Sequence, residues 1–275
     1  VSVDRINEVL DTHTSIYDAP DAQEVTGTDI EFRHVSFRYN EGSEDVLHDL
    51  NFHIRAGESI GIIGSTGCGK SSLVSLIPRL YDPSSGEVLL GGTDLKKLRL
   101  EDVRARIGMV LQESILFSGK ISDTFRFGNE NAMEKDMLKA AADAQALDFI
   151  QEKENGFESV VEQRGKNFSG GQKQRLSIAR TLTRQPDILI LDDATSAVDL
   201  ATEAKLQNAI RSREGTCTLI IIAQRISAVM GLDRIFVLDD GMLADSGTHA
   251  ELIERCEIYR SIAASQLGEE VLKRG

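Results

Sequence analysis

The order of apolar and polar positions along the chain predicts an alternation of strands and helices. Five short apolar runs have the length of strands that are buried on both faces, and they occupy residues 59–63, 107–111, 188–191, 217–223 and 235–238. Stretches of helical character separate several of these runs. Such an alternation is typical of an α/β fold in which helices cover both faces of a parallel sheet.

Other parts of the chain have different patterns. Residues 29–54 contain short alternating segments with aromatic and β-branched residues, which predict an antiparallel β layer. Helices are expected over residues 70–80, over the stretch 122–150, which is rich in Ala, Lys and Asp, and over residues 171–183. A surface helix is expected over residues 249–266.

The composition is that of an ordinary globular protein. Of the 275 residues, 41% are hydrophobic and 27% are charged, and no apolar run approaches the roughly 18–20 residues of a membrane-spanning helix. The net charge of −13 argues against a nucleic-acid partner, because phosphate backbones are bound by basic surfaces. The three cysteines form no CxxC pair, so we expect neither a zinc site nor a disulfide framework. This cysteine usage fits a reducing, cytoplasmic compartment.

One glycine-rich loop has a specific chemical pattern. It lies between the apolar run at 59–63 and the helix expected at 70–80, and it consists of Gly64, Ser65, Thr66, Gly67, Cys68, Gly69, Lys70 and Ser71. In this context the pattern predicts a phosphate-binding loop, whose glycines let backbone N–H groups turn towards a phosphate. The Lys70 ammonium is expected to contact the phosphate oxygens and the Ser71 hydroxyl to coordinate Mg²⁺.

An acidic residue ends the apolar run at 188–191. Asp192 would lie at the carboxyl edge of a central strand, which is where open α/β sheets bind their ligands. We therefore expect its carboxylate to lie near the magnesium ion of the loop and to act through water. The alternative is that Asp192 caps the following element.

In their order along the chain, these motifs resemble the nucleotide-binding domain of an ABC transporter. The resemblance covers about residues 28–265, and stretches at 79–83, 175–180 and 247–249 resemble the exporter branch of the family. It implies a P-loop NTPase (RecA-like) core, an antiparallel β subdomain and an inserted helical subdomain over about residues 113–184. The residues that carry it are Tyr39, the loop at Gly64, Gln112, the signature Ser169-Gly170-Gly171-Gln172, Asp192 and the run Ser196-Ala197-Val198-Asp199.

The resemblance also implies roles for single residues around an ATP molecule. Tyr39 would stack on the adenine ring, or else only pack across strands. Gln112 would bind the magnesium shell or the attacking water and communicate with membrane loops; the alternative is an ordinary surface glutamine. Ser72 would join the loop in binding the nucleotide.

The signature, residues 169–172, implies a second nucleotide-binding domain. It precedes a predicted helix, so backbone N–H groups and the helix dipole would face an anion. In the family this anion is the γ-phosphate of an ATP held by the opposite domain of a head-to-tail dimer. Asp199 would touch the partner across that interface, or else cap a helix.

Two positions depart from the family pattern. The residue after the magnesium carboxylate is Asp193 where a glutamate is usual, and the residue after Ala223 is Gln224 where a histidine is usual. Aspartate is shorter by roughly 1.5 Å, and a misplacement near 1 Å costs on the order of 10²-fold in rate. Glutamine can hydrogen-bond a phosphate but cannot shuttle a proton. Gln163 also replaces a usual glutamate before the signature.

Each substitution alone has a harmless interpretation, because aspartate can act as a base and glutamine can hold a phosphate. Together they predict a site that binds Mg-ATP and hydrolyses it slowly, with Lys70, Gln112, Asp193 and Gln224 as its catalytic residues.

We therefore expect one half of a heterodimeric exporter at the cytoplasmic side of the cell membrane. Residues 1–27 would comprise the end of a transmembrane-domain helix, with an amphipathic helix at 1–11, and a linker; residues 28–275 would form the ATP-binding domain. The missing initiator Met predicts a fragment of a longer chain. The partners would be a transmembrane domain and the nucleotide-binding domain of a different subunit. The alternatives are a soluble ABC-type ATPase and an ATP-sensing regulatory module outside transport.

Overall fold

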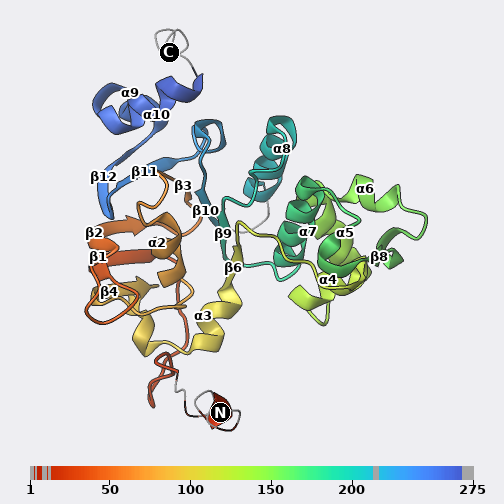
Figure 1. Cartoon of the computed structure of the whole chain (residues 1–275), viewed down its shortest axis with the longest axis horizontal. Coiled ribbons are helices and arrows are strands. Elements are labelled where there is room, and N and C mark those ends of the chain that lie inside the picture. The colour runs from red at the N-terminus through yellow and green to blue at the C-terminus, as the bar shows by residue number, and fades with distance from the viewer. Residues whose placement is uncertain (1–2, 4, 8–10, 12–13, 213–216, 268–275) are drawn as a thin grey trace.

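A central, mostly parallel sheet organises the molecule. The computed structural model describes residues 3, 5–7, 11, 14–212 and 217–267 (Figure 1). Within them the sheet has the order β12-β11-β3-β10-β9-β6, and only the edge strand β12 runs antiparallel to its neighbour. The predicted parallel sheet is therefore confirmed. Its strands are β3 (Ser59–Ile63), β6 (Ile107–Val110), β9 (Ile188–Asp192), β10 (Thr218–Ile222), β11 (Arg234–Asp239) and β12 (Met242–Gly247).

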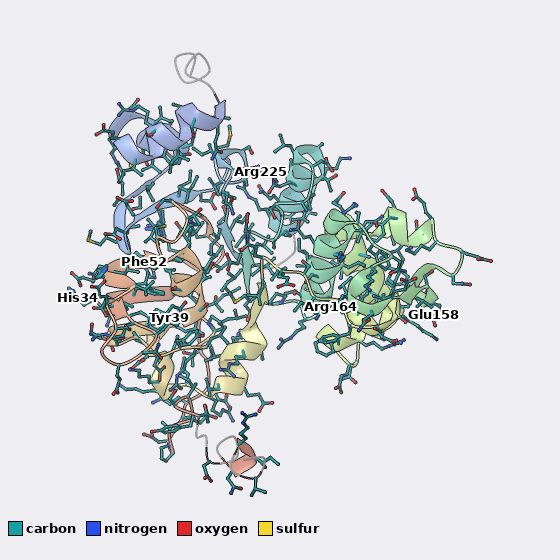
Figure 2. The ribbon with its side chains drawn as sticks, viewed as in Figure 1. His34, Tyr39, Phe52, Glu158, Arg164 and Arg225 are labelled. Carbon is teal, nitrogen blue, oxygen red and sulfur yellow. The ribbon has the colours of Figure 1, made fainter. Side chains whose placement is uncertain are left out.

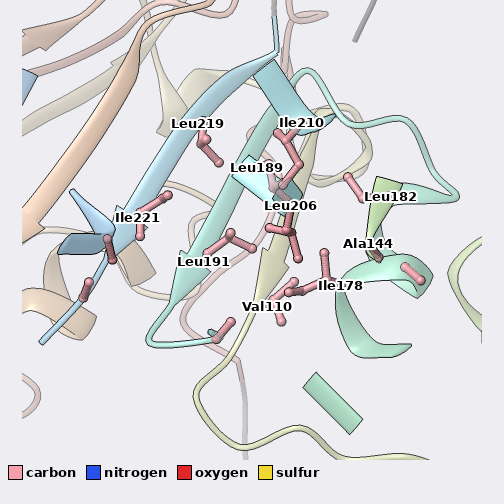
Figure 3. Close-up of a cluster of buried hydrophobic side chains, with 14 of the residues drawn as sticks. Val110, Ala144, Ile178, Leu182, Leu189, Leu191, Leu206, Ile210, Leu219 and Ile221 are labelled. Carbon is pink, nitrogen blue, oxygen red and sulfur yellow. The ribbon is translucent and has the colours of Figure 1, made fainter. Parts of the chain in front are cut away.

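The central strands are buried on both faces, which explains their continuous apolar sequence. In β9, Leu189 and Leu191 belong to one core cluster, and Ile188 and Ile190 belong to the other. The first cluster includes residues of α7 (Gly170–Leu182) and α8 (Leu200–Arg211), as Figure 3 shows. The second contains residues of α2 (Lys70–Leu76), α3 (Leu100–Arg106) and a second sheet.

This second sheet is antiparallel, as expected from residues 29–54. Its order is β2-β1-β4-β5, so later strands extend the predicted layer. Two of the short segments expected from the sequence, at 30–32 and from Val35 onwards, form one continuous strand, β1. Its pairing with β2 shifts register on either side of Val35. The strands are β1 (Ile30–Phe37), β2 (Leu47–Ile54), β4 (Ser85–Leu90) and β5 (Thr93–Asp94).

A helical region lies on the other side of the central sheet from the antiparallel layer (Figure 1). The helical stretch expected at 122–150 is three helices, because the chain is extended at Asn129 and left-handed at Gln145 (φ 55°). The elements between β6 and α7 are β7 (Gly119–Lys120), α4 (Ile121–Gly128), α5 (Glu134–Asp143), α6 (Leu147–Gln151), η2 (Gly156–Glu158), β8 (Val160–Val161) and η3 (Gln163–Gly165). The short helices η1 (Leu95–Lys97) and η4 (Ile226–Ala228) lie elsewhere.

The C-terminal segment differs from its prediction. Instead of one surface helix, α9 (His249–Arg255) and α10 (Glu257–Leu267) are separated by Cys256, whose backbone is extended. Tyr259 is fully buried, and its hydroxyl lies 2.8 Å from Nδ1 of His249. The expected helix at 1–11 lies largely outside the described residues. Among the residues that are described, no helix is both long and apolar enough to cross a bilayer.

Candidate active site

Four neighbouring parallel strands bring the candidate site residues to one edge of the central sheet. The strands β3, β10, β9 and β6 are adjacent, and their carboxyl ends lead into the loop at Gly64, Gln224, Asp192 with Asp193, and Gln112. Ligands bind at this edge in open α/β sheets. A cavity of about 390 Å³ lies there, lined by Tyr39, Val46, Thr66, Gly67, Gly69, Lys70, Ser71, Ser72, Gln112, Asp192, Asp193, Ile222 and Gln224.

The glycine-rich loop curls around the Lys70 side chain. The Lys70 ammonium donates to the carbonyl oxygens of Gly64 at 2.8 Å and Ser65 at 2.7 Å. A side chain at Gly64 would place its Cβ 2.1 Å from the Leu238 carbonyl oxygen, and Gly69 is left-handed at φ 96°. Both positions therefore require glycine. The loop leaves the Lys70 ammonium at the cavity, where it can contact an anionic ligand.

Ser71 and Asp192 form a pair of oxygen donors in the cavity. The Ser71 hydroxyl donates to Oδ1 of Asp192 at 3.1 Å. Burial raises the pKa of the Asp192 carboxyl, opposed by this hydrogen bond and by the charge of Lys70. Within the described part of the chain, no group of three or more His, Cys, Asp or Glu side chains could hold a metal. The pair fits Mg²⁺, which takes few protein oxygens and completes its shell with water and substrate phosphates.

Asp193 lies at the centre of a hydrogen-bonded cluster formed by the segments that follow three strands. Its Oδ2 accepts from Nε2 of Gln112 at 3.1 Å and from Nε2 of Gln224 at 2.8 Å. Its backbone is left-handed (φ 49°), and its N–H donates to the Ile222 carbonyl at 3.0 Å. Burial, followed by the charge of Asp192, raises the pKa of Asp193. The structure thus brings together the three residues to which the sequence assigned water activation and phosphate sensing.

Tyr39 lies at the mouth of the cavity and is 48% exposed. Its ring packs edge-on against Phe37 and Tyr81, with centroids 4.9 and 5.2 Å away, and its hydroxyl lies 2.8 Å from Oγ of Ser72. These contacts hold an exposed aromatic ring (labelled in Figure 2) beside the phosphate loop.

The signature is not part of this cavity. Ser169 caps α7: its hydroxyl accepts from the Gln172 N–H at 3.3 Å, while the Gln172 side chain accepts from the Ser169 N–H at 3.0 Å. Gly170 and Gly171 form the first turn of this 13-residue helix. Asp199 caps α8 by accepting from the Thr202 N–H at 2.9 Å, which is the alternative role that the sequence left open.

The structure adds residues that sequence reasoning missed. A guanidinium nitrogen of Arg225 donates to the carbonyl oxygens of Thr195 and Val198 and to the buried carboxylate of Glu203 (3.0, 3.3 and 3.1 Å). Arg225 lies beside α8 in Figure 2. The Gln266 side chain, which belongs to α10, hydrogen-bonds the backbone of Gln224 and Ile226. Neither contact has a clear sequence signal. Only the structure shows that the Glu203 side chain is 3% exposed and so needs a cationic partner.

Comparison with known proteins gives consistent matches. A family model described as "ABC transporter" matches residues 47–196. The protein described as "Uncharacterized ABC transporter ATP-binding protein YfiB" of Bacillus subtilis (strain 168) is 45% identical over 98% of this chain and 47% of its own length. The "Beta-(1-->2)glucan export ATP-binding/permease protein NdvA" of Rhodopseudomonas palustris (strain BisB18) is 42% identical over 94% of this chain and 43% of its own.

A solved structure also matches. It is described as "Structure of a bacterial Atm1-family ABC exporter with ATP bound" and superposes with a TM-score of 0.91 at 36% identity, over 95% of this chain and 46% of that one. The expected P-loop fold is therefore confirmed. The chain spans about half the length of the bacterial relatives that it matches.

Proposed function

Because this chain belongs to the ABC transporter family, as an ATP-binding domain of the exporter type, we propose that it binds Mg-ATP at residues 64–71 and drives export through head-to-tail dimerisation with a partner domain. Lys70 neutralises the phosphate oxygens, and Ser71 with Asp192 holds the metal. Tyr39 stacks on the base. We also propose that the chain works with a transmembrane domain of the same transporter and lies at the cytoplasmic face of the cell membrane.

We infer that the proposed ATP site hydrolyses slowly, and the geometry around Asp193 supports this inference. A base must reach the attacking water, and the aspartate side chain is shorter than a glutamate by roughly 1.5 Å. The amides of Gln112 and Gln224 both donate to one oxygen of Asp193 and orient this short carboxylate, but they do not add to its reach. Gln224 itself cannot take up a proton at neutral pH.

The resulting division of labour involves two different domains. This chain retains a capped signature helix, which would complete the ATP site of its partner. A slow site in one domain and an intact signature for the other fit a heterodimeric exporter in which the partner's site turns over faster. Relatives described as export ATP-binding/permease proteins support the assignment to export.

The test is ATP turnover by the purified chain at high protein concentration, compared with Asp193→Glu, Gln224→His and the double variant. We expect slow turnover by the unmodified chain and a rise of about 10-fold or more in the double variant, with the Kd for ATP within about threefold of the starting value. The exposed Asp21→Glu is the control and leaves turnover unchanged.

Turnover by the unmodified chain as fast as that of the double variant would disprove the slow site. ATP binding without turnover in any variant would instead favour the ATP-sensing module.

A further inference from the structure

The side chain of Gln266, in the C-terminal helix α10, hydrogen-bonds the backbone of the loop that carries Gln224. Nε2 of Gln266 donates to the Gln224 carbonyl oxygen at 2.7 Å, and Oε1 of Gln266 accepts from the Ile226 N–H at 2.8 Å. A single amide group therefore uses both its donor and its acceptor on the backbone of one loop. Such two-point contacts fix orientation as well as distance.

A second set of contacts fixes the same loop through the side chain of Arg225, which belongs to it. Its guanidinium contacts the carbonyl oxygens of the loop after β9 and the carboxylate of Glu203, as described above. Gln224 thus lies between two anchors: its own carbonyl is bound by α10, and the next side chain is bound by α8. With its backbone fixed in this way, the Gln224 side chain donates to Asp193 at 2.8 Å.

The contact with Gln266 lies beside the phosphate loop. A cavity of about 580 Å³ is lined by Gln224 and Gln266 together with Ser65 and Thr66 of that loop. The end of α10 is therefore adjacent to the candidate active site, although Gln266 is absent from the lining of the nucleotide cavity itself.

We propose that Gln266 is a positioning residue for ATP hydrolysis: it acts through the backbone of residues 224–226 and aims the Gln224 amide at Asp193. This inference rests on the proposed function, because it assigns a catalytic consequence to the loop. It gives the C-terminal helix a direct influence on the switch position, although Gln266 follows Gln224 by 42 residues.

The test compares Gln266→Ala, which removes both contacts, with Gln266→Glu, which keeps the acceptor for the Ile226 N–H and loses the donor. Ser265→Ala is the matched control, because its exposed hydroxyl bonds only within α10, to the Ile262 carbonyl. Amide hydrogen exchange is followed by mass spectrometry in peptides covering residues 222–229. Single-turnover kinetics with excess protein give the rate of the chemical step, and equilibrium titration gives the Kd for ATP.

In Gln266→Ala we expect amide exchange at residues 224–226 to be at least about fivefold faster, as for the loss of one net hydrogen bond. The rate of the chemical step should fall by about the same factor. The Kd for ATP stays within about twofold. In Gln266→Glu a carboxylate oxygen faces the Gln224 carbonyl oxygen in place of the donor, so we expect changes at least as large as in Gln266→Ala. Ser265→Ala matches the unmodified chain.

Unchanged exchange in Gln266→Ala would overturn the inference, whatever the kinetics. Faster exchange with an unchanged rate would also overturn it, because the contact would then anchor the loop without serving catalysis. A chain that binds no ATP would disprove the proposed function itself, and the Kd measured on the unmodified chain shows that failure separately.

Discussion

At the scale of single residues, the two adjacent aspartates dominate the electrostatics of the site. Asp192 and Asp193 are 7% and 8% exposed. Burial raises the pKa of each, and for Asp193 the neighbouring charge of Asp192 adds to the effect. A carboxyl whose pKa is higher in the folded than in the unfolded chain favours folding below its unfolded pKa, and this contribution is lost as the pH rises through the folded pKa. At neutral pH the ionised Asp192 and Asp193 carboxylates therefore lower the free energy of unfolding of the nucleotide-free chain.

We predict that Asp192→Asn raises the melting temperature of the nucleotide-free chain at pH 7 by about 1–3 °C. The amide oxygen can still accept from Ser71, while the buried charge and its repulsion of Asp193 disappear. Thermal unfolding followed by circular dichroism in EDTA, from about pH 4 to pH 7, should show a smaller loss of stability with rising pH than in the unmodified chain.

Asp21→Asn, at an exposed position outside the site, is the control for this measurement. A lower melting temperature for Asp192→Asn at pH 7 would show that the carboxylate stabilises the empty site. Magnesium-dependent ATP binding should weaken in the same variant, because a neutral amide oxygen is a poorer ligand for Mg²⁺ than a carboxylate.

Much of the site was predictable from the sequence at this scale. Lys70 and Ser71 belong to one contiguous loop, and Asp192 and Gln224 follow strands whose apolar runs are evident. Gln266 was not predictable, because its partners lie 40 and 42 residues earlier in the chain and an exposed glutamine has no distinctive pattern. Contacts of this kind depend on how α10 packs, which tertiary structure alone decides.

At the scale of elements, the signature helix α7 is attached to the loop that follows β9. The Gln174 side chain donates to Oγ of Ser196 at 3.1 Å and accepts from the Ala197 N–H at 2.9 Å. Gly171 lies against the same loop, since a Cβ there would be 2.7 Å from the Ala197 carbonyl oxygen. The helix that presents the signature and the loop that begins at Asp193 are therefore packed together.

We predict that Gly171→Ala destabilises the chain by about 1–3 kcal/mol, because the added methyl group forces α7 and this loop apart. Gly170→Ala is a matched control, since its Cβ would meet only the Ala197 Cβ, at an ordinary 3.5 Å, and alanine favours the helix. Urea unfolding of both variants measures the difference. Equal stabilities would mean that the loop moves freely with respect to α7.

The elements themselves were predicted unevenly. Buried parallel strands were found because both faces demand apolar residues, as in β9 and β10. Helix ends were less visible. The break at Gln145 depends on a left-handed backbone that a glutamine rarely adopts, and the break at Cys256 divides a stretch whose apolar residues continue on both sides. Such breaks follow from packing and leave little trace in the local sequence.

At the scale of the whole molecule, the ATP-binding parts are divided between two places. The cavity contains the phosphate loop, Asp193 and Gln224, whereas the signature begins a helix that contributes nothing to the cavity lining. In the proposed head-to-tail dimer, each chain would therefore supply half of each of two composite sites. In a head-to-tail dimer, a slow site in one chain is compatible with rapid turnover at the other.

This arrangement predicts complementation between two defective forms of the chain. The first is the unmodified chain, with an intact signature and the proposed slow site. The second has a repaired site and a blocked signature, in Asp193→Glu/Gln224→His/Ser169→Arg, because the arginine at the helix cap fills the space of the phosphate contact. Each form alone should turn over slowly. Their mixture should exceed the sum of the two by about 10-fold or more, because the first form supplies the signature for the repaired site of the second.

The control mixes the second form with the chain carrying only Ser169→Arg, which has neither a repaired site nor a free signature. That mixture should show no gain, and ATP binding by every variant is verified by titration beforehand. A lack of gain in the first mixture, when both chains bind ATP, would contradict head-to-tail sharing. A gain that also appears in the control mixture would mean that Ser169→Arg does not block the signature, and the gain could then not be assigned to a signature supplied by the first form.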